Sequence, residues 1–136
     1  MDKDKKKKTF NFSKSIDRVS VTLTVPQVTD AGTVETVEVE HSFKIDSLFD
    51  AMEAYRSELY VLNKKGEPAI DLAAAGLALW DKTIVEVNGY DLEGVKDWRK
   101  FFHTNPVAIE HASQAGTLLA ERLGMLQGKL AVPFVK

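Results

Sequence analysis

Hydrophobic and polar residues alternate in two segments near the start of the chain, residues 19–25 and residues 37–45. A period of two is typical of a strand that buries one face. An Asp-Ala-Gly sequence at residues 30–32 supplies turn chemistry between them, so the pattern predicts an antiparallel hairpin. Phe10 and Phe12 suggest a short strand before it. The positions predicted to share one side are Val19, Val21, Leu23 and Val25, and then Val37, Val39, His41, Phe43 and Ile45.

The period changes to that of an α-helix after residue 46. Ser47 with Asp50 three residues later is similar to a capping box, and the apolar stripe that follows predicts a helix ending before Gly66. Pro68 is a favoured residue of a first helical turn, so a second helix is predicted to begin there. This second segment is apolar nearly all round as far as Trp80, which predicts the central buried helix. The stripe of the first helix consists of Leu48, Met52, Tyr55, Leu59 and Leu62.

Two further helices are predicted after a short β-branched segment. Residues 83–87 favour a short strand or an extended link that stops at Asn88-Gly89. An Asn105-Pro106 pair predicts the N-cap of a longer helix that runs to about Leu123. Between these lies a short helix whose aromatic face comprises Val95, Trp98, Phe101 and Phe102. The longer helix carries small residues that allow another helix to approach closely, namely Ala108, Ala112, Ala115 and Gly116.

The order of these elements predicts an α+β fold. An N-terminal antiparallel β-hairpin or sheet is expected to be covered by a C-terminal helical part of four helices, because a sheet with one apolar face must be covered. A chain of 136 residues has the size of one ordinary domain. We therefore predict a disordered lysine-rich tail at residues 1–8, a single α+β domain at residues 9–128 and an apolar tail at residues 129–136.

Composition and charge exclude several classes of function. The chain has no cysteine, which excludes disulfides, thiolate zinc sites, iron–sulfur clusters and a cysteine nucleophile. The first eight residues hold five lysines and two aspartates, so the remainder is acidic and is a poor surface for nucleic acid. No apolar segment follows the lysines as in a signal peptide, and none is as long as a membrane span. We expect a soluble cytoplasmic protein with no nucleic-acid or membrane partner.

The three histidines are the first candidates for chemistry. His41 lies on the apolar side of a predicted strand, where a hydrogen-bonded core histidine is more common than a ligand. His103 and His111 are eight residues apart without an H-E-x-x-H sequence, so no metal site is predicted. The chain also lacks a G-x-S-x-G elbow, a P-loop and a G-x-G-x-x-G sequence. We therefore predict no catalytic, cofactor-binding or metal-ligating residue, and no cofactor.

Two apolar segments are candidates for binding a protein partner. The aromatic face of the short helix is opposite a basic one and either caps the core or forms an exposed patch. The tail places Leu130, Val132 and Phe134 in alternation, and Pro133 confines such a segment to the edge of a sheet. The tail is expected to dock on this chain or on a neighbouring copy. The predicted partner-binding residues are Trp98, Phe101, Phe102, Leu130, Val132 and Phe134.

Residues 69–123 resemble the tail assembly chaperones of long-tailed bacteriophages and prophages. The resemblance rests on the order of its parts. A helix of small apolar residues leads into a V-x-V-x-G link at Val85, Val87 and Gly89. A short aromatic helix follows, and Asn105-Pro106 then begins a helix that contains small residues.

The resemblance implies binding rather than catalysis. Such chaperones are non-enzymatic, associate with themselves and are absent from the finished particle. They coat the hydrophobic, helical tape-measure protein in the bacterial host cytoplasm before tail-tube subunits polymerise around it. Two alternatives remain open at this point. One is a structural particle component, such as a tail-tube, tail-terminator or head–tail connector protein, and the other is a small cytoplasmic enzyme or regulator without a phage link.

Overall fold

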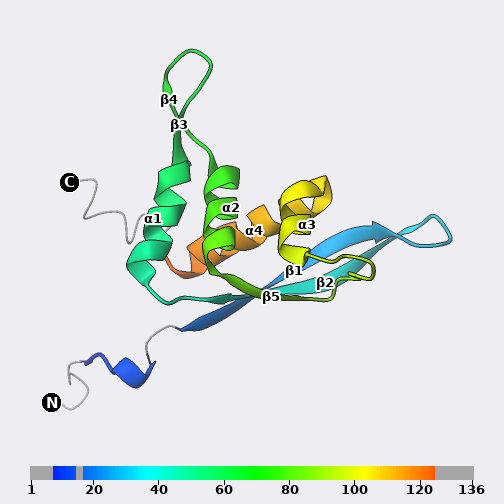
Figure 1. Cartoon of the computed structure of the whole chain (residues 1–136), viewed down its shortest axis with the longest axis horizontal. Helices are drawn as coiled ribbons and strands as arrows, with labels where there is room; N and C mark the ends of the chain where they lie inside the picture. Colours follow the sequence, from blue (N-terminus) through cyan, green and yellow to red (C-terminus); the bar gives the residue numbers. More distant parts are fainter. Residues whose placement is uncertain (1–7, 15–16, 125–136) are drawn as a thin grey trace, which may run out of the picture.

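Two long antiparallel strands form the base on which the helices lie (Figure 1). The computed structural model describes residues 8–14 and 17–124. Strand β1 (Arg18–Val28) pairs with β2 (Val34–Lys44) along its whole length, from Arg18 opposite Lys44 to Val28 opposite Val34. Strand β5 (Ile84–Asn88) pairs antiparallel with the other side of β2, which gives the strand order β1-β2-β5. The predicted hairpin and the predicted strand after residue 83 are both confirmed.

All four predicted helices form, and they cover one face of this sheet (Figure 1). The predicted α+β class is therefore confirmed. Each helix begins at a polar side chain that accepts a hydrogen bond from a backbone N–H of the first turn, which replaces a missing intrahelical partner. The helices and their caps are α1 (Leu48–Leu59) with Ser47, α2 (Leu72–Thr83) with Asp71, α3 (Trp98–Thr104) with Asp97 and α4 (Pro106–Arg122) with Asn105.

The segment between α1 and α2 differs from the prediction. The first helix ends at Leu59 instead of continuing to Leu62, and β3 (Tyr60–Leu62) pairs antiparallel with β4 (Pro68–Ile70). The physical reason is the turn between them. The Asn63 side-chain oxygen accepts hydrogen bonds from the backbone N–H groups of Lys65 at 2.8 Å and Glu67 at 3.0 Å. Such local side-chain bonds offer the backbone an alternative to a helix.

Two smaller predictions are also corrected. Pro68 begins a strand, and the second helix begins only after Asp71, whose carboxylate accepts from the Ala74 N–H at 3.0 Å. No strand forms at Phe10 and Phe12; residues Phe12–Lys14 instead form a short 3₁₀ turn. Residues 1–7 of the lysine-rich tail predicted at residues 1–8, and all of the apolar tail predicted at residues 129–136, lie outside the described residues.

The core lies between the sheet and helices α1, α2 and α4. Helix α2 packs against both α1 and α4, and its Ala75, Leu79 and Trp80 are 0% exposed. This confirms α2 as the central buried helix. The sheet contributes its apolar alternation, with Val21 and Phe43 also 0% exposed. Burial of one face by the predicted period-two residues fixes the strand register, because a shift of one residue would expose all of them.

Helices α2 and α4 cross with their backbones in contact. A Cβ atom on Gly116 would overlap the carbonyl oxygen of Gly76, and a Cβ atom on Gly76 would lie 2.5 Å from the carbonyl oxygen of Ser113. The crossing is also tied by hydrogen bonds, since Ser113 Oγ donates to the carbonyl of Ala73 at 2.7 Å. The small residues of α4 therefore have the predicted role. They let α4 pack closely against α2, and shallow hollows lie along this crossing.

Candidate interaction surface

The three aromatic residues predicted on α3 do not share one environment. Phe102 is 0% exposed and packs against Trp80, with ring centroids 5.4 Å apart. Phe102 is therefore a core residue, and its place in an exposed partner-binding surface is corrected. Trp98 and Phe101 are half-buried at the edge of the same cluster. The helical spacing could not separate them, because positions 98, 101 and 102 all lie on one side of a helix.

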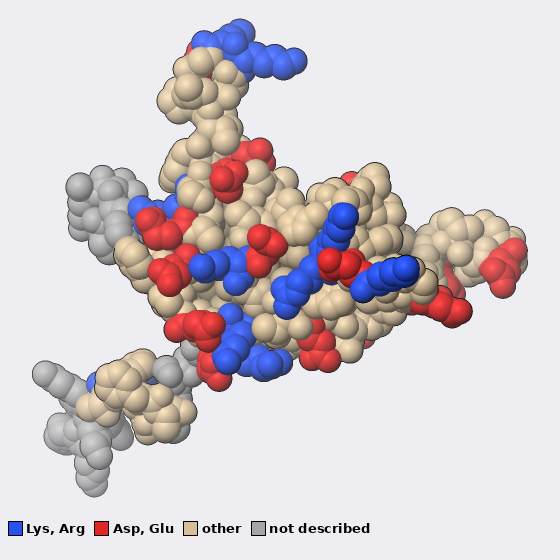
Figure 2. Space-filling model, in the orientation of Figure 1, with Lys and Arg blue, Asp and Glu red and all other residues tan. Residues whose placement is uncertain are grey.

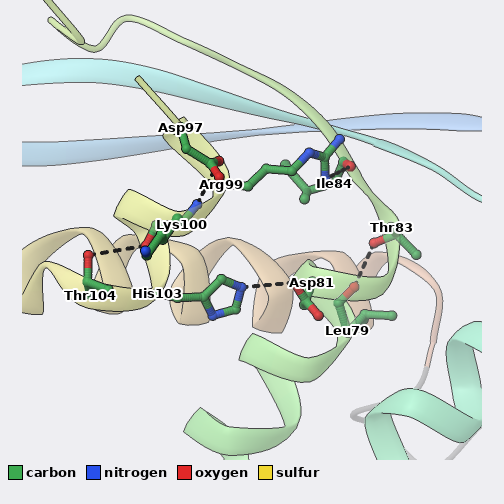
Figure 3. Close-up of polar contacts among 9 residues, drawn as sticks. All are labelled: Leu79, Asp81, Thr83, Ile84, Asp97, Arg99, Lys100, His103 and Thr104. Carbon is green, nitrogen blue, oxygen red and sulfur yellow. Dashed lines mark hydrogen bonds and ion pairs between the residues drawn. The ribbon is translucent and has the colours of Figure 1, made fainter. Parts of the chain in front are cut away.

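The basic residues of α3 attach this helix to its neighbours (Figure 3). Arg99 donates to the carbonyl of Ile84 at 3.0 Å, and its guanidinium lies 4.8 Å from the ring centroid of Trp98. His103 Nε2 lies 2.8 Å from Asp81 Oδ1 at the end of α2. Of the four basic residues on this segment, Lys96, Arg99, Lys100 and His103, the second and the fourth thus contact other parts of the chain. The α3 surface is an attachment to α2 and β5 more than a free basic patch.

A chain of hydrogen bonds runs through the core beneath α3. Trp80 Nε1 donates to His41 Nδ1 at 2.9 Å, and His41 Nε2 lies 2.7 Å from the Tyr90 hydroxyl. Because an indole N–H can only donate, Nδ1 accepts and the ring proton of neutral His41 is assigned to Nε2. The Tyr90 hydroxyl accepts that proton's hydrogen bond and donates to His111 Nδ1 at 3.0 Å. The chain ties β2, α2 and α4 to the loop after β5.

This arrangement uses the ring nitrogens of His41 in hydrogen bonds within the core. Burial, together with a smaller effect of the neighbouring His111, lowers the pKa of His41 to about 4. Burial also raises the pKa of Tyr90 and lowers the pKa of His111. Both nitrogens of His41 are used in hydrogen bonds, so neither has a lone pair for a ligand. The prediction of a hydrogen-bonded core histidine is confirmed, and the described residues contain no cluster of three metal-ligating side chains.

Two adjoining hollows lie along the α2–α4 crossing. Each encloses about 440 Å³, and they share Ala73, Ser113 and Gln114. The first extends to Leu23 on the sheet and to Leu118 on α4, and the second extends toward the first turns of both helices. Their other lining residues are Thr117 in the first, and Asp71, Ala74, Leu77, Ile109 and Glu110 in the second. Together they make one shallow, mainly apolar surface with a polar rim.

The sequence prediction missed a second apolar surface, on the β3–β4 hairpin. Tyr60, Leu62 and Ile70 are 63%, 71% and 64% exposed. The sequence pattern predicts Leu62 in the apolar stripe of the first helix and Ile70 in the second helical segment, which made these two candidate core residues. The signal that could have separated them is the Asn63-x-x-Gly66 sequence, since Asn63 closes a turn with its side chain and Gly66 adopts a φ of +79°.

Comparison with known proteins finds no match from which a function for these surfaces could be transferred. No protein-family model, no curated protein and no solved structure matches the chain. Within the described part of the chain, no helix has both the length and the apolar character needed to cross a membrane. The predicted contact residues Leu130, Val132 and Phe134 lie outside the described residues.

Proposed function

We propose that this chain is a non-enzymatic tail assembly chaperone that associates with itself and binds the hydrophobic, helical tape-measure protein of a phage tail. The observation that carries the proposal is the double hollow along α2 and α4. Its shared wall is Ala73, Ser113 and Gln114, and the leucines in its lining are Leu23, Leu77 and Leu118. An apolar helix would be held by shape and by burial of its apolar face, as in other helix-in-groove complexes.

The size and the lining of the hollows fit such a client. A helix with its side chains is about 10 Å across. A bound helix would therefore extend over more than one of these hollows and needs a continuous surface. The two hollows provide continuity because they adjoin at Ser113. Small side chains at Ala73 and Ala74 let a second backbone approach, and Asp71 and Glu110 add two carboxylates to the lining. A shallow apolar site of this kind releases its client when better contacts are offered.

The resemblance to tail assembly chaperones lies over the same elements. It covers residues 69–123, which include α2, α3 and α4, and these helices supply all but two of the residues lining the two hollows. Tail-tube subunits are the partners that the resemblance adds to the client and to further copies of this chain. The acidic body of the chain disfavours nucleic acid as a partner.

The test is binding of a synthetic apolar helical peptide, measured by fluorescence anisotropy with and without a charge in the hollow. Ala73→Glu places a carboxylate at the position shared by both hollows. Ala73 is exposed and is the second residue of α2, where an acidic side chain favours the helix. We expect at least about tenfold weaker peptide binding and unchanged folding, because the peptide would have to desolvate the carboxylate.

Val107→Glu is the matched control. Val107 is also the second residue of its helix and is 59% exposed, but it lines neither hollow. Peptide binding by this variant should equal that of the unmodified protein. Absence of peptide binding by the unmodified protein, or equal binding by both variants, would contradict the proposal. A salt-insensitive ring that does not exchange subunits would instead favour a structural particle component.

A further inference from the structure

Two hairpins project from the body of the protein in different directions (Figure 1). One is the β3–β4 hairpin, residues 60–70, which we name the arm. The other is the free end of the β1–β2 hairpin, residues 26–38, which we name the acidic end. Lysine side chains lie at the tip of the arm, and acidic side chains lie along the acidic end (Figure 2). The two projections therefore differ in the sign of their charge.

The arm exposes large apolar side chains on one face. Tyr60 lies opposite Ile70 and Leu62 lies opposite Pro68 in the strand pairing. Residues directly opposite each other point to the same side of a hairpin, so these four side chains form a single patch. The other face carries Val61 and Ala69, which are less exposed. An apolar patch on a projecting hairpin is typical of a contact surface.

The backbone of the arm is already ordered for such a contact. Its turn is closed by hydrogen bonds from the Asn63 N–H to the Glu67 carbonyl and from the Gly66 N–H to the Asn63 carbonyl, both at 2.9 Å. At its base, the Asp71 N–H donates to the Leu59 carbonyl at 2.8 Å. A partner would bind a preformed surface and would lose little entropy in ordering it. Lys64 and Lys65 are exposed at the tip, and neither forms an ion pair with another described residue.

The acidic end has complementary features. Residues 26–38 include Asp30, Glu35 and Glu38 and no lysine or arginine, and all three carboxylates are exposed. Val28 and Val34 lie directly opposite each other and are 70% and 71% exposed. This end therefore joins an apolar pair to three carboxylates, as the arm joins an apolar patch to two lysines.

We propose that the arm of one copy docks on the acidic end of a second copy of this chain. Opposite charges at the two ends specify the partner and its orientation, while the apolar side chains provide the area to be buried. The contact joins two different surfaces, so it is heterologous, and repetition produces a closed ring or an open helical array. An array with successive copies in one orientation is a geometry that can follow a long helical client. The inference rests on the self-association within the proposed function and assigns its surfaces.

The experiment is a charge exchange followed by light scattering across a concentration series. Lys64→Glu/Lys65→Glu makes the arm acidic, and Glu35→Lys/Glu38→Lys makes the other end basic. Each variant alone then presents like charges at the contact, and its self-association should weaken about tenfold or more. An equimolar mixture restores opposite charges at every contact, so association should return. The unmodified protein should associate less at high ionic strength, because salt screens exposed charges.

The control reverses Lys96 and Lys100 to glutamate. Both are exposed near α3, so the net charge changes as in the arm variant while both projections stay intact. Association of this control should match that of the unmodified protein. Monomeric unmodified protein at high concentration, unchanged association of either exchange variant, or failure of the folded mixture to associate would each overturn the proposal. Peptide binding distinguishes a failure of the contact between copies from a failure of the client site. Both exchange variants leave the hollows intact and should still bind the apolar helix.

Discussion

The α2–α4 crossing and the β3–β4 arm show opposite uses of small and large side chains. At the crossing, Gly76 and Gly116 remove side chains altogether so that two backbones meet. In the arm, Tyr60 and Leu62 extend into solvent from a two-stranded hairpin. The first region gains stability from contacts within one chain. The second leaves apolar area exposed to water, which is unfavourable in the monomer and is relieved only when a partner covers it.

The comparison teaches that stability and binding are assigned to different parts of this molecule. The crossing and the aromatic cluster hold the helices on the sheet, and a change there should act on the free energy of unfolding. The arm, the acidic end and the hollows lie at the surface, and a change there should act on association with little effect on unfolding. The predictions below measure the free energy of unfolding, and the last one also measures self-association so that this division can fail.

The largest effect is expected at Trp80. Its side chain is 0% exposed, contacts Phe102 and Trp98, and donates the hydrogen bond to His41. Trp80→Ala should lower the free energy of unfolding by about 3–5 kcal/mol, the range for an aromatic residue removed from a packed core. Trp98→Ala should cost about 1–2 kcal/mol, because Trp98 is half-buried and loses less apolar contact. Urea titration of both variants measures the difference, and equal losses would contradict the assignment of Trp98 to the edge of the cluster.

Gly116→Ala should lower the free energy of unfolding by about 3 kcal/mol, the upper part of the range for overpacking. The new methyl group would meet the Gly76 carbonyl, which is backbone and cannot rotate away. In an exposed helix, the same change would raise helix stability by about 1 kcal/mol. The sign of the change in a thermal or urea unfolding experiment therefore tests the crossing directly, and a stabilised variant would show that the helices lie further apart.

The sequence predicted the packed strands and helices better than the arm, and the reason lies in the local sequence of each region. The strands β1 and β2 were predicted because their period-two pattern agrees with their burial. Helix α2 was predicted because its segment is apolar nearly all round, and α4 because Asn105-Pro106 marks its start. The arm was missed because Leu62 continues the apolar stripe of α1, while the hydrogen bonds that close the turn after the helix come from one side chain, Asn63. A helical period states which side chains share a face, and it contains no information on where a turn interrupts it.

Acidification should destabilise the protein through His41. Burial lowers the pKa of this histidine from 6.5 to about 4 in the folded chain, so the unfolded chain takes up a proton first as the pH falls. Its contribution is complete above pH 6.5. It is lost progressively as the pH falls toward about 4, and the total loss is about 3 kcal/mol.

The measurement is the free energy of unfolding between these two pH values, with His41→Gln as the control. The glutamine variant does not titrate, so its pH slope keeps the contributions of the carboxylates and of His111 and lacks that of His41. A variant with the same slope as the unmodified protein would contradict the burial of a neutral His41.

The candidate site was predicted less completely than the fold, because exposure is a property of three-dimensional packing. Trp98, Phe101 and Phe102 are indistinguishable in a helical pattern, yet only Phe102 faces Trp80 from inside the core. The hollows form where α2 and α4 cross, and the contact between residues 76 and 116 depends on how two distant segments pack. Small residues in α4 indicated a close approach, but they did not identify the partner helix.

The smallest effect on stability is expected at Leu62, and it is the sharpest test of the comparison. Leu62→Ala should change the free energy of unfolding by no more than about 0.5 kcal/mol, because the side chain is 71% exposed. Leu119→Ala deletes the same atoms where the side chain is 0% exposed, and should cost about 2–5 kcal/mol. Self-association should show the reverse order, with a weaker complex for Leu62→Ala and an unchanged one for folded Leu119→Ala. A Leu62→Ala variant that unfolds easily would place the arm within the cooperative core, and one that associates normally would remove Leu62 from the contact between copies.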